Sequence, residues 1–395
     1  MYIIEYKTMF SFFSRCNIFD CCINFNKTKE DTVAITGYNS HRVTFEQNLR
    51  EKNIREVAIS PETIRLNIPT LYEDKSEPRS PPPPPPPRQY PDDASDCSLS
   101  SKKWTHPEQQ YLSLIRDIID HGYMEKGRNG NTLVKFGHSM RFSLQDGTIP
   151  ILTTKRVAWK TCFEELFWFI RGGTSNHELI AKNVHIWDAN GSREFLDSRG
   201  LFDREENDLG PIYGFQWRHF NADYTNCHRS YKGEGIDQLA EIIENLKNPE
   251  TRTSRRLIMT AWNPCQLDAM ALPPCHIMAQ FHVHSDRYLS CALYQRSGDV
   301  GLGVPFNIAS YSLLTHLLAR HCGLEAYEFI HFIGNCHIYE PHIEPLKIQL
   351  TREPKNFPKI RIANEHENIE NYSLDDIVWE TKYEYCDAIK MAMIA

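Results

Sequence analysis

The feature that most constrains this chain is the segment Leu272-Pro273-Pro274-Cys275-His276 and the alternation that follows it. Two prolines fix the backbone directly before a thiol. Residues 277–284 then alternate, with the apolar side chains at odd-numbered positions on one face of a predicted strand. Ser285-Asp286-Arg287 is a turn signal, and residues 288–295 alternate again. The pattern predicts an antiparallel hairpin with one buried face.

This hairpin would bring a thiol and a cation together. If Asp286 is the centre of the turn, Cys275 lies opposite Ser297 and His276 lies opposite Arg296. A one-residue bulge would shift the pairing without separating these groups. A positive charge beside a thiol favours the thiolate, so Cys275 is a candidate nucleophile. The ordinary alternative is a small buried hydrophobic residue, which is the common role of cysteine in a chain that has 12 of them.

Composition limits the function classes. The 395 residues have a formal net charge of −7, so no overall basic field attracts the chain to DNA. The cysteines show no metal-ligand spacing and no short disulfide framework, which indicates no metal site and a reduced cytoplasmic location, with the nucleus as the alternative. Charged residues interrupt every apolar run before membrane length, and the N-terminus lacks the residue order of a secretory signal.

Three segments differ in pattern. Residues 1–73 form a weakly patterned N-terminal extension, residues 74–103 a proline-rich linker that is expected to be disordered, and residues 104–395 a folded domain. Residues 81–87 are an unbroken proline run, which favours an extended left-handed helix. This run fits two roles: a stiff spacer, or a ligand of an SH3- or WW-type domain.

Helical spacing of apolar residues predicts helices at residues 107–122, 160–171, 237–248 and 308–321. In the second of these, Glu165 lies on an apolar side, where a carboxylate is kept either for a structural hydrogen bond or for chemistry. Lys160 and Glu164 have the spacing of an ion pair. Asn307 lies near the start of the fourth helix, where an asparagine often caps the helix.

An adjacent pair, Arg255-Arg256, leads into a predicted strand at residues 257–262. Neighbours on a strand point to opposite faces, so both arginines cannot easily serve one local site.

Several long segments closely resemble the folate-dependent thymidylate synthase family, the type with a cysteine nucleophile. Besides the proline–cysteine segment, the matching stretches are residues 154–156, 186–191, 210–219, 294–310 and 342–346. The resemblance covers about residues 104–395, and the first hundred residues match nothing in that family.

The resemblance implies an α+β fold with a large mixed sheet flanked by helices, one face of which packs in a homodimer. It implies reductive methylation of dUMP to dTMP, with 5,10-methylenetetrahydrofolate as one-carbon and hydride donor and dihydrofolate as product. It also implies that Arg255 and Arg256 reach across the dimer into the partner's site.

The resemblance further implies roles for individual residues. The expected catalytic residues are Cys275, Glu165, Tyr213, Asn307 and Arg296. The expected dUMP-binding residues are Arg128, Arg255, Arg256, Arg296, Ser297, Gly298, Asp299, Asn307, His337 and Tyr339. The expected folate-binding residues are Trp187, Asn190, Asp299, Gly303, Phe306 and Ile394.

Two other functions fit the same residues. The fold can hydroxymethylate a pyrimidine nucleotide when water replaces hydride at the last step, although an asparagine at position 307 suits uracil better than cytosine. A non-catalytic homologue could instead be a scaffold or RNA binder that acts through the proline-rich arm. The sequence departs from the family pattern at Asn335, Pro341, residues 383–387 and Ile394.

Overall fold

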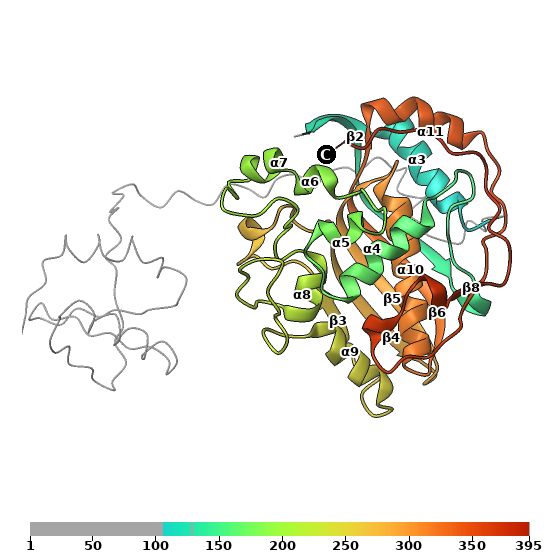
Figure 1. Cartoon of the computed structure of the whole chain (residues 1–395). Helices are drawn as coiled ribbons and strands as arrows, with labels where there is room; N and C mark the ends of the chain where they lie inside the picture. Colours follow the sequence, from blue (N-terminus) through green and yellow to red (C-terminus); the bar gives the residue numbers. More distant parts are fainter. Residues whose placement is uncertain (1–105, 128, 395) are drawn as a thin grey trace, which may run out of the picture. The chain divides into compact units, whose positions relative to one another are not determined.

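The computed structural model describes residues 106–127 and 129–394, all of which belong to one compact unit, Ser98–Ala395 (Figure 1). The N-terminal extension, the linker and the proline run at residues 81–87 lie outside the described residues, and so does Arg128. Within the described ranges, no helix has the length and apolar character that a bilayer span requires.

The centre of the fold is a six-stranded sheet in the order β1-β2-β6-β5-β4-β3. Strands β5 and β6 pair in parallel and all other neighbours pair antiparallel, so the expected mixed sheet is confirmed. A second sheet pairs β7 with β8. The strands are β1 (Tyr123–Gly127), β2 (Gly130–Ser143), β3 (Ile258–Thr260), β4 (His276–His284), β5 (Tyr288–Asp299), β6 (Glu325–Tyr339), β7 (Ile360–Ile362) and β8 (Ile377–Trp379).

Helices cover one face of the large sheet (Figure 1). Helix α10 packs on β5, β6 and α4, and α3 packs on β2 and β6. The α-helices are α3 (Gln109–His121), α4 (Trp159–Ile170), α5 (Asn176–Ile180), α6 (Asp188–Gly191), α7 (Arg193–Ser198), α8 (Tyr213–His219), α9 (Gln238–Lys247), α10 (Gly303–His321) and α11 (Ile343–Leu350). Short 3-10 turns are η3 (Gln145–Gly147), η4 (Leu267–Ala269), η5 (Glu340–His342), η6 (Ile369–Asn371) and η7 (Leu374–Asp376).

Three of the four predicted helices begin and end within two residues of their expected bounds, but α10 begins five residues early. Its first turn contains Pro305, which the sequence interpretation placed in a preceding loop. Proline suits a first turn because the N–H that it lacks has no partner there in any case. Asn307 therefore lies inside the helix, and the interpretation of Asn307 as a cap is wrong.

The predicted hairpin is β4 and β5, but its register differs by one residue at the functional end. A bulge between His276 and Met278 pairs His276 with Gln295 instead of Arg296. The Arg296 N–H donates to the carbonyl of Cys275 at 2.8 Å. Cys275 is thus opposite Arg296, not Ser297, and the thiol lies one position closer to the cation than predicted.

Glu108 ties the start of α3 to the segment before α4. The side chain has no exposed surface, and its two oxygens accept from the backbone N–H and the hydroxyl of both Thr153 and Thr154, at 2.6–2.9 Å. Replacing Glu108 by alanine should lower the free energy of unfolding by about 2–5 kcal/mol, because two buried backbone donors lose their acceptor. Urea unfolding measures this loss, and Glu125→Ala, which removes an exposed glutamate of β1, should change stability little.

Candidate active site

The thiol predicted to be reactive lies at the end of an inner strand of the sheet, directly before β4. Cys275 is half-buried, and a guanidinium nitrogen of Arg296, Nη2, lies 3.7 Å from its sulfur. A cation at this distance stabilises the thiolate relative to the thiol. The predicted convergence of Cys275 with Arg296 is therefore present.

The two prolines hold the cation in place. Arg296 Nε donates to the Pro274 carbonyl at 2.7 Å, and Nη2 donates to the Pro273 carbonyl at 2.9 Å. The guanidinium also lies over the Trp262 ring, 5.5 Å from its centroid. Proline carbonyls whose positions are fixed by restricted φ angles orient the arginine before any ligand binds.

Other cysteines of the described ranges lie in different surroundings. Cys162, Cys291, Cys322 and Cys336 are buried, and burial raises the pKa of each thiol, to about 12 for the last three. A buried apolar thiol stays protonated and inert. Partial exposure next to an arginine distinguishes Cys275 from this buried group.

Tyr213 and His276 support the backbone at Cys275. The Tyr213 hydroxyl accepts from the Cys275 N–H at 2.7 Å, and its ring stacks on His276 with centroids 4.1 Å apart. His276 Nδ1 and the Tyr311 hydroxyl are 2.8 Å apart. Sequence reasoning missed His276 and Tyr311, because regular alternation places His276 on the open face and the bulge turns it inward. Its position directly after the nucleophile was the available signal.

Glu165 lies on α4 and accepts from the Trp187 indole N–H at 2.7 Å. Burial raises the pKa of Glu165 to about 7, against the opposing effect of this hydrogen bond. The predicted burial of this carboxylate is borne out in part: Glu165 is partly buried, and desolvation is the main cause of its raised pKa. The expected Lys160–Glu164 pair is wrong, because Glu164 binds Lys182 and Lys160 lies over the Trp159 ring.

Asp299 organises the turn between β5 and α10. Its Oδ1 accepts from the Gly301 N–H at 2.8 Å and the Leu302 N–H at 3.3 Å, and Nδ1 of buried His342 lies 3.8 Å away. His342 Nε2 lies 2.8 Å from the carbonyl of Ala392. One network therefore links the end of β5 to the C-terminal segment that contains Ile394.

Parallel pairing of β5 with β6 places two more groups of predicted residues side by side. Ser297 pairs with Asn335, and Asp299 pairs with His337. The His337 ring lies edge-on to Tyr339, 5.3 Å between centroids, and its Nδ1 contacts the Asn335 side-chain oxygen at 3.0 Å. Asn335, one of the departures from the family pattern, thus provides an acceptor that orients His337.

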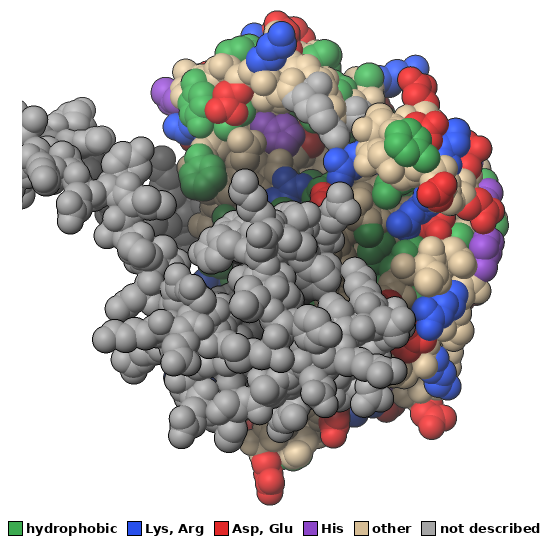
Figure 2. Space-filling model, turned by 90° about the vertical axis from the view of Figure 1, so that its left-hand side faces the viewer, with side chains coloured by type: hydrophobic (Ala, Val, Ile, Leu, Met, Phe, Trp, Pro, Cys, Tyr) green, Lys and Arg blue, Asp and Glu red, His purple; other side chains and the backbone are tan. Residues whose placement is uncertain are grey.

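The remaining predicted folate-binding residues come from two elements. Trp187 and Asn190 are at α6 and are nearly buried, and Gly303 and Phe306 are in the first turn of α10. Gly298 is closely packed, since a Cβ there would lie 2.8 Å from Val304. Seen from the side in Figure 2, the described surface is hollowed, with basic, acidic and histidine side chains visible inside the hollow.

The predicted pair Arg255 and Arg256 does not lie near Cys275 of the same subunit. Arg255 and Arg256 are exposed, and the Arg255 carbonyl accepts from Gln280 at 3.1 Å. Gln280 is five residues along β4 from Cys275, which corresponds to roughly 17 Å.

Comparisons with known proteins give one family. A family model described as thymidylate synthase matches residues 109–395. The chain is 54% identical to the thymidylate synthase of Equine herpesvirus 2 over 291 residues, which cover 73% of this chain and 99% of the relative. It is 54% identical to human thymidylate synthase over 290 residues, 73% of this chain and 91% of the relative.

Bifunctional proteins also match. The chain is 54% identical to the bifunctional dihydrofolate reductase-thymidylate synthase of Plasmodium berghei over 297 residues, 75% of this chain and 50% of the relative. The chain therefore spans about half the length of these bifunctional relatives.

Proposed function

The chain belongs to the thymidylate synthase family, and from this premise we propose that it methylates dUMP to dTMP with 5,10-methylenetetrahydrofolate. The family assignment confirms the resemblance and the methyltransferase class expected from the sequence. The observation that carries the proposal for this chain is the half-buried Cys275 sulfur, 3.7 Å from Arg296 and backed by the Tyr213 hydroxyl.

Cys275 acts as the nucleophile. Carbon 5 of uracil is a poor nucleophile, and addition of the thiolate to carbon 6 makes carbon 5 enolate-like, so that it can attack an electrophile. Arg296 stabilises the thiolate through its contact at 3.7 Å. Tyr213 accepts from the Cys275 N–H and so fixes the backbone at the reacting sulfur.

Arg296 and Asn307 account for recognition of the nucleotide. Arg296 Nη1 makes no hydrogen bond to the described part of the chain, which leaves it for a phosphate oxygen. Ser297 follows it on β5 and offers a hydroxyl to the same anion. The Asn307 amide has both a donor and an acceptor, which match O4 and N3–H of uracil. His337 and Tyr339 on β6 offer hydrogen bonds to the deoxyribose hydroxyl.

Residues around Glu165 suit the folate. Methylenetetrahydrofolate supplies the one-carbon unit and the hydride. Asp299 fits a pterin, because Oδ1 serves the turn while Oδ2 makes no hydrogen bond to the described residues. Trp187 and Phe306 add aromatic surface, with Asn190, Gly303 and Ile394 nearby in the proposed pocket. Glu165, with its pKa near 7, holds or moves a proton through water.

Tritium release from dUMP labelled at carbon 5 tests the proposal. Release should require both the enzyme and the folate, and mass analysis should find a methyl group on the product. A hydroxymethyl product would support the alternative chemistry, and a folded dimer without release would support the scaffold.

A homodimer completes the site in this proposal. Met278, Tyr294 and Phe332 are in register on adjacent strands β4, β5 and β6, and each is 37–44% exposed on the face opposite the helices. A contiguous apolar row of this kind marks a protein interface. Packing of two such faces would let Arg255 and Arg256 of one subunit reach the partner's phosphate site, where one subunit alone leaves them distant.

Subunit mixing tests the shared site. Cys275→Ser and the double variant Arg255→Ala/Arg256→Ala should each be nearly inactive as homodimers. Refolding them together should restore dTMP formation, because each mixed dimer contains one site with both an intact thiol and intact arginines. No recovery, with mixed dimers present by mass analysis, would contradict donation in trans.

The proline run at residues 81–87 keeps its two proposed roles, a spacer or a ligand of SH3- or WW-type domains. A pulldown with panels of these domains that retains nothing would leave the spacer. Cytoplasmic location, with the nucleus as the alternative, is likewise a proposal.

A further inference from the structure

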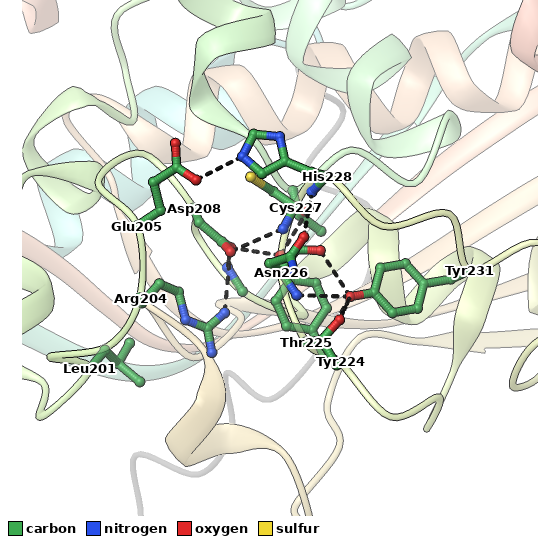
Figure 3. A network of polar contacts seen from close by, with 12 residues as sticks. Leu201, Arg204, Glu205, Asp208, Tyr224, Thr225, Asn226, Cys227, His228 and Tyr231 are labelled. Carbon is green, nitrogen blue, oxygen red and sulfur yellow. Dashed lines mark hydrogen bonds and ion pairs between the residues drawn. The ribbon is translucent and has the colours of Figure 1, made fainter.

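A cluster of three side chains with different ligand chemistry lies outside the proposed active site. Glu205 comes from the turn before α8, and Cys227 and His228 come from the loop after it. One carboxylate oxygen, one sulfur and one ring nitrogen lie within 4.8 Å of one another. Figure 3 shows the Cys227 sulfur next to the His228 ring, which faces Glu205.

These residues take no part in the site described above. Cys227 lines a separate cleft of about 610 Å³, together with Phe215, Arg218 and Tyr231. None of the residues proposed to bind dUMP or folate lines this cleft. A function of the cluster can therefore be measured independently of dTMP formation.

A buried carboxylate fixes the loop that presents the ligands. Asp208 is 2% exposed, and its Oδ2 accepts from the Cys227 N–H at 3.0 Å, while Oδ1 accepts from the Tyr224 hydroxyl at 2.6 Å. Arg204 lies 3.4 Å from the same carboxylate (Figure 3). The backbone of Cys227 is thus held by Asp208, which Tyr224 and Arg204 hold in turn, and metal ligands are commonly oriented by hydrogen bonds of this kind.

The other end of the loop is fixed as well. The Tyr231 hydroxyl accepts from the backbone N–H of Thr225 at 2.8 Å and of Asn226 at 3.0 Å. The Asn226 side-chain oxygen accepts from the His228 N–H at 3.0 Å (Figure 3). Because hydrogen bonds fix both ends of the loop, the loop should lose little conformational entropy when a ligand binds.

We propose that Glu205, Cys227 and His228 bind a Zn²⁺ ion. Sulfur, imidazole nitrogen and carboxylate oxygen are the three donor types that zinc prefers. In a tetrahedral zinc site, ligand atoms lie roughly 3.3–3.8 Å apart. Here His228 Nε2 and Glu205 Oε2 are 2.7 Å apart, and no two of the three candidate ligand atoms are more than 4.8 Å apart. The ion replaces the proton between His228 Nε2 and Glu205 Oε2, now 2.7 Å apart, and the proton of the thiol.

Loss of the Glu205–His228 ion pair costs little. The Glu205–His228 pair is exposed, with side chains 55% and 65% accessible, so the ion pair that would be lost contributes little to stability. The same exposure leaves the fourth coordination position to water. The site is therefore a three-residue site at the surface, with an open position.

Titration of the full chain with Co²⁺, followed by competition with Zn²⁺, tests the proposal. The wild-type complex should show thiolate-to-cobalt charge-transfer absorption that Cys227→Ser lacks, and zinc should bind at least ten-fold more weakly to Cys227→Ser and to His228→Gln. Cys265→Ser, which removes an exposed thiol elsewhere, is the matched control and should bind as the wild type does. The comparison isolates this site from the other eleven cysteines of the chain.

Thermal unfolding gives a second readout. Zinc should raise the melting temperature of the wild type and of Cys265→Ser more than that of Cys227→Ser or Glu205→Gln. Equal cobalt spectra and equal zinc affinities in the wild type and Cys227→Ser would overturn the proposal. All these variants should form dTMP at the wild-type rate, so failure here leaves the proposed enzymatic function untouched.

Discussion

Replacing Cys275 by serine should lower kcat by about four orders of magnitude or more while dUMP still binds. A serine hydroxyl is nearly isosteric with the thiol but far less acidic, so Arg296 at 3.7 Å cannot generate an anion from it at neutral pH. Arg296 itself stays oriented by the Pro273 and Pro274 carbonyls, so the phosphate site should persist. Tritium release measures the loss of turnover, and calorimetric titration with dUMP measures binding.

Cys386→Ser is the matched control, because Cys386 is also half-buried but lies in the C-terminal segment. It should keep near-normal turnover. Fluoro-dUMP with the folate should form a covalent complex with the wild type and with Cys386→Ser but not with Cys275→Ser. Near-normal dTMP formation by Cys275→Ser would refute the nucleophile assignment.

Much of the nucleophile's surroundings was predictable from the sequence because hairpin geometry is local. The turn at Ser285 and Asp286 and the alternation of the two strands bring residue 275 close to residue 296 at either register. The partial burial of Glu165 followed in the same way from helical periodicity. Such features depend on periods of two or 3.6 residues, which any single chain displays.

The errors came from features that periodicity does not encode. The bulge at His276 depends on how β4 pairs with β5, and it moved His276 into the core beside Tyr213 and Tyr311. The early start of α10 follows a turn in which Asp299 accepts from the N–H groups of Gly301 and Leu302, and helical periodicity does not register such a turn.

The partners of ion pairs could not be predicted from the sequence either. Glu164 selects Lys182, which lies 18 residues away, over the nearer Lys160. Only the tertiary fold decides which long side chain reaches a given carboxylate.

Replacing Glu165 by glutamine should lower kcat by about 10²–10⁴-fold, the usual contribution of a positioned acid or base. Glutamine keeps an oxygen for the Trp187 indole but cannot exchange a proton, so the pocket should keep its shape. Glu164→Gln on the same helix removes only a partly exposed ion pair with Lys182 and should leave kcat nearly unchanged. Nucleotide binding by Glu165→Gln should also be near normal.

Glu165→Gln should raise the stability of the protein while it lowers the activity. The pKa of Glu165 is about 7 in the folded protein against an ordinary value of 4.5, so the folded state binds the proton more tightly than the unfolded state does. Its contribution to stability is present below pH 4.5 and is lost as the pH rises through 7. Glu165→Gln should therefore be more stable than the wild type at pH 8, by roughly 3 kcal/mol, and equal to it near pH 4. Urea unfolding at the two pH values measures the difference.

Trp187→Phe separates the proton role of Glu165 from a purely structural one. With a Glu165 pKa of about 7, kcat/KM should show an inflection near pH 7. The indole hydrogen bond lowers this pKa, so its loss in Trp187→Phe should move the inflection to higher pH. A structural role predicts lower activity with the inflection unmoved, because packing losses do not titrate. An unchanged inflection in Trp187→Phe, together with an inflection that survives in Glu165→Gln, would assign the titration to another group.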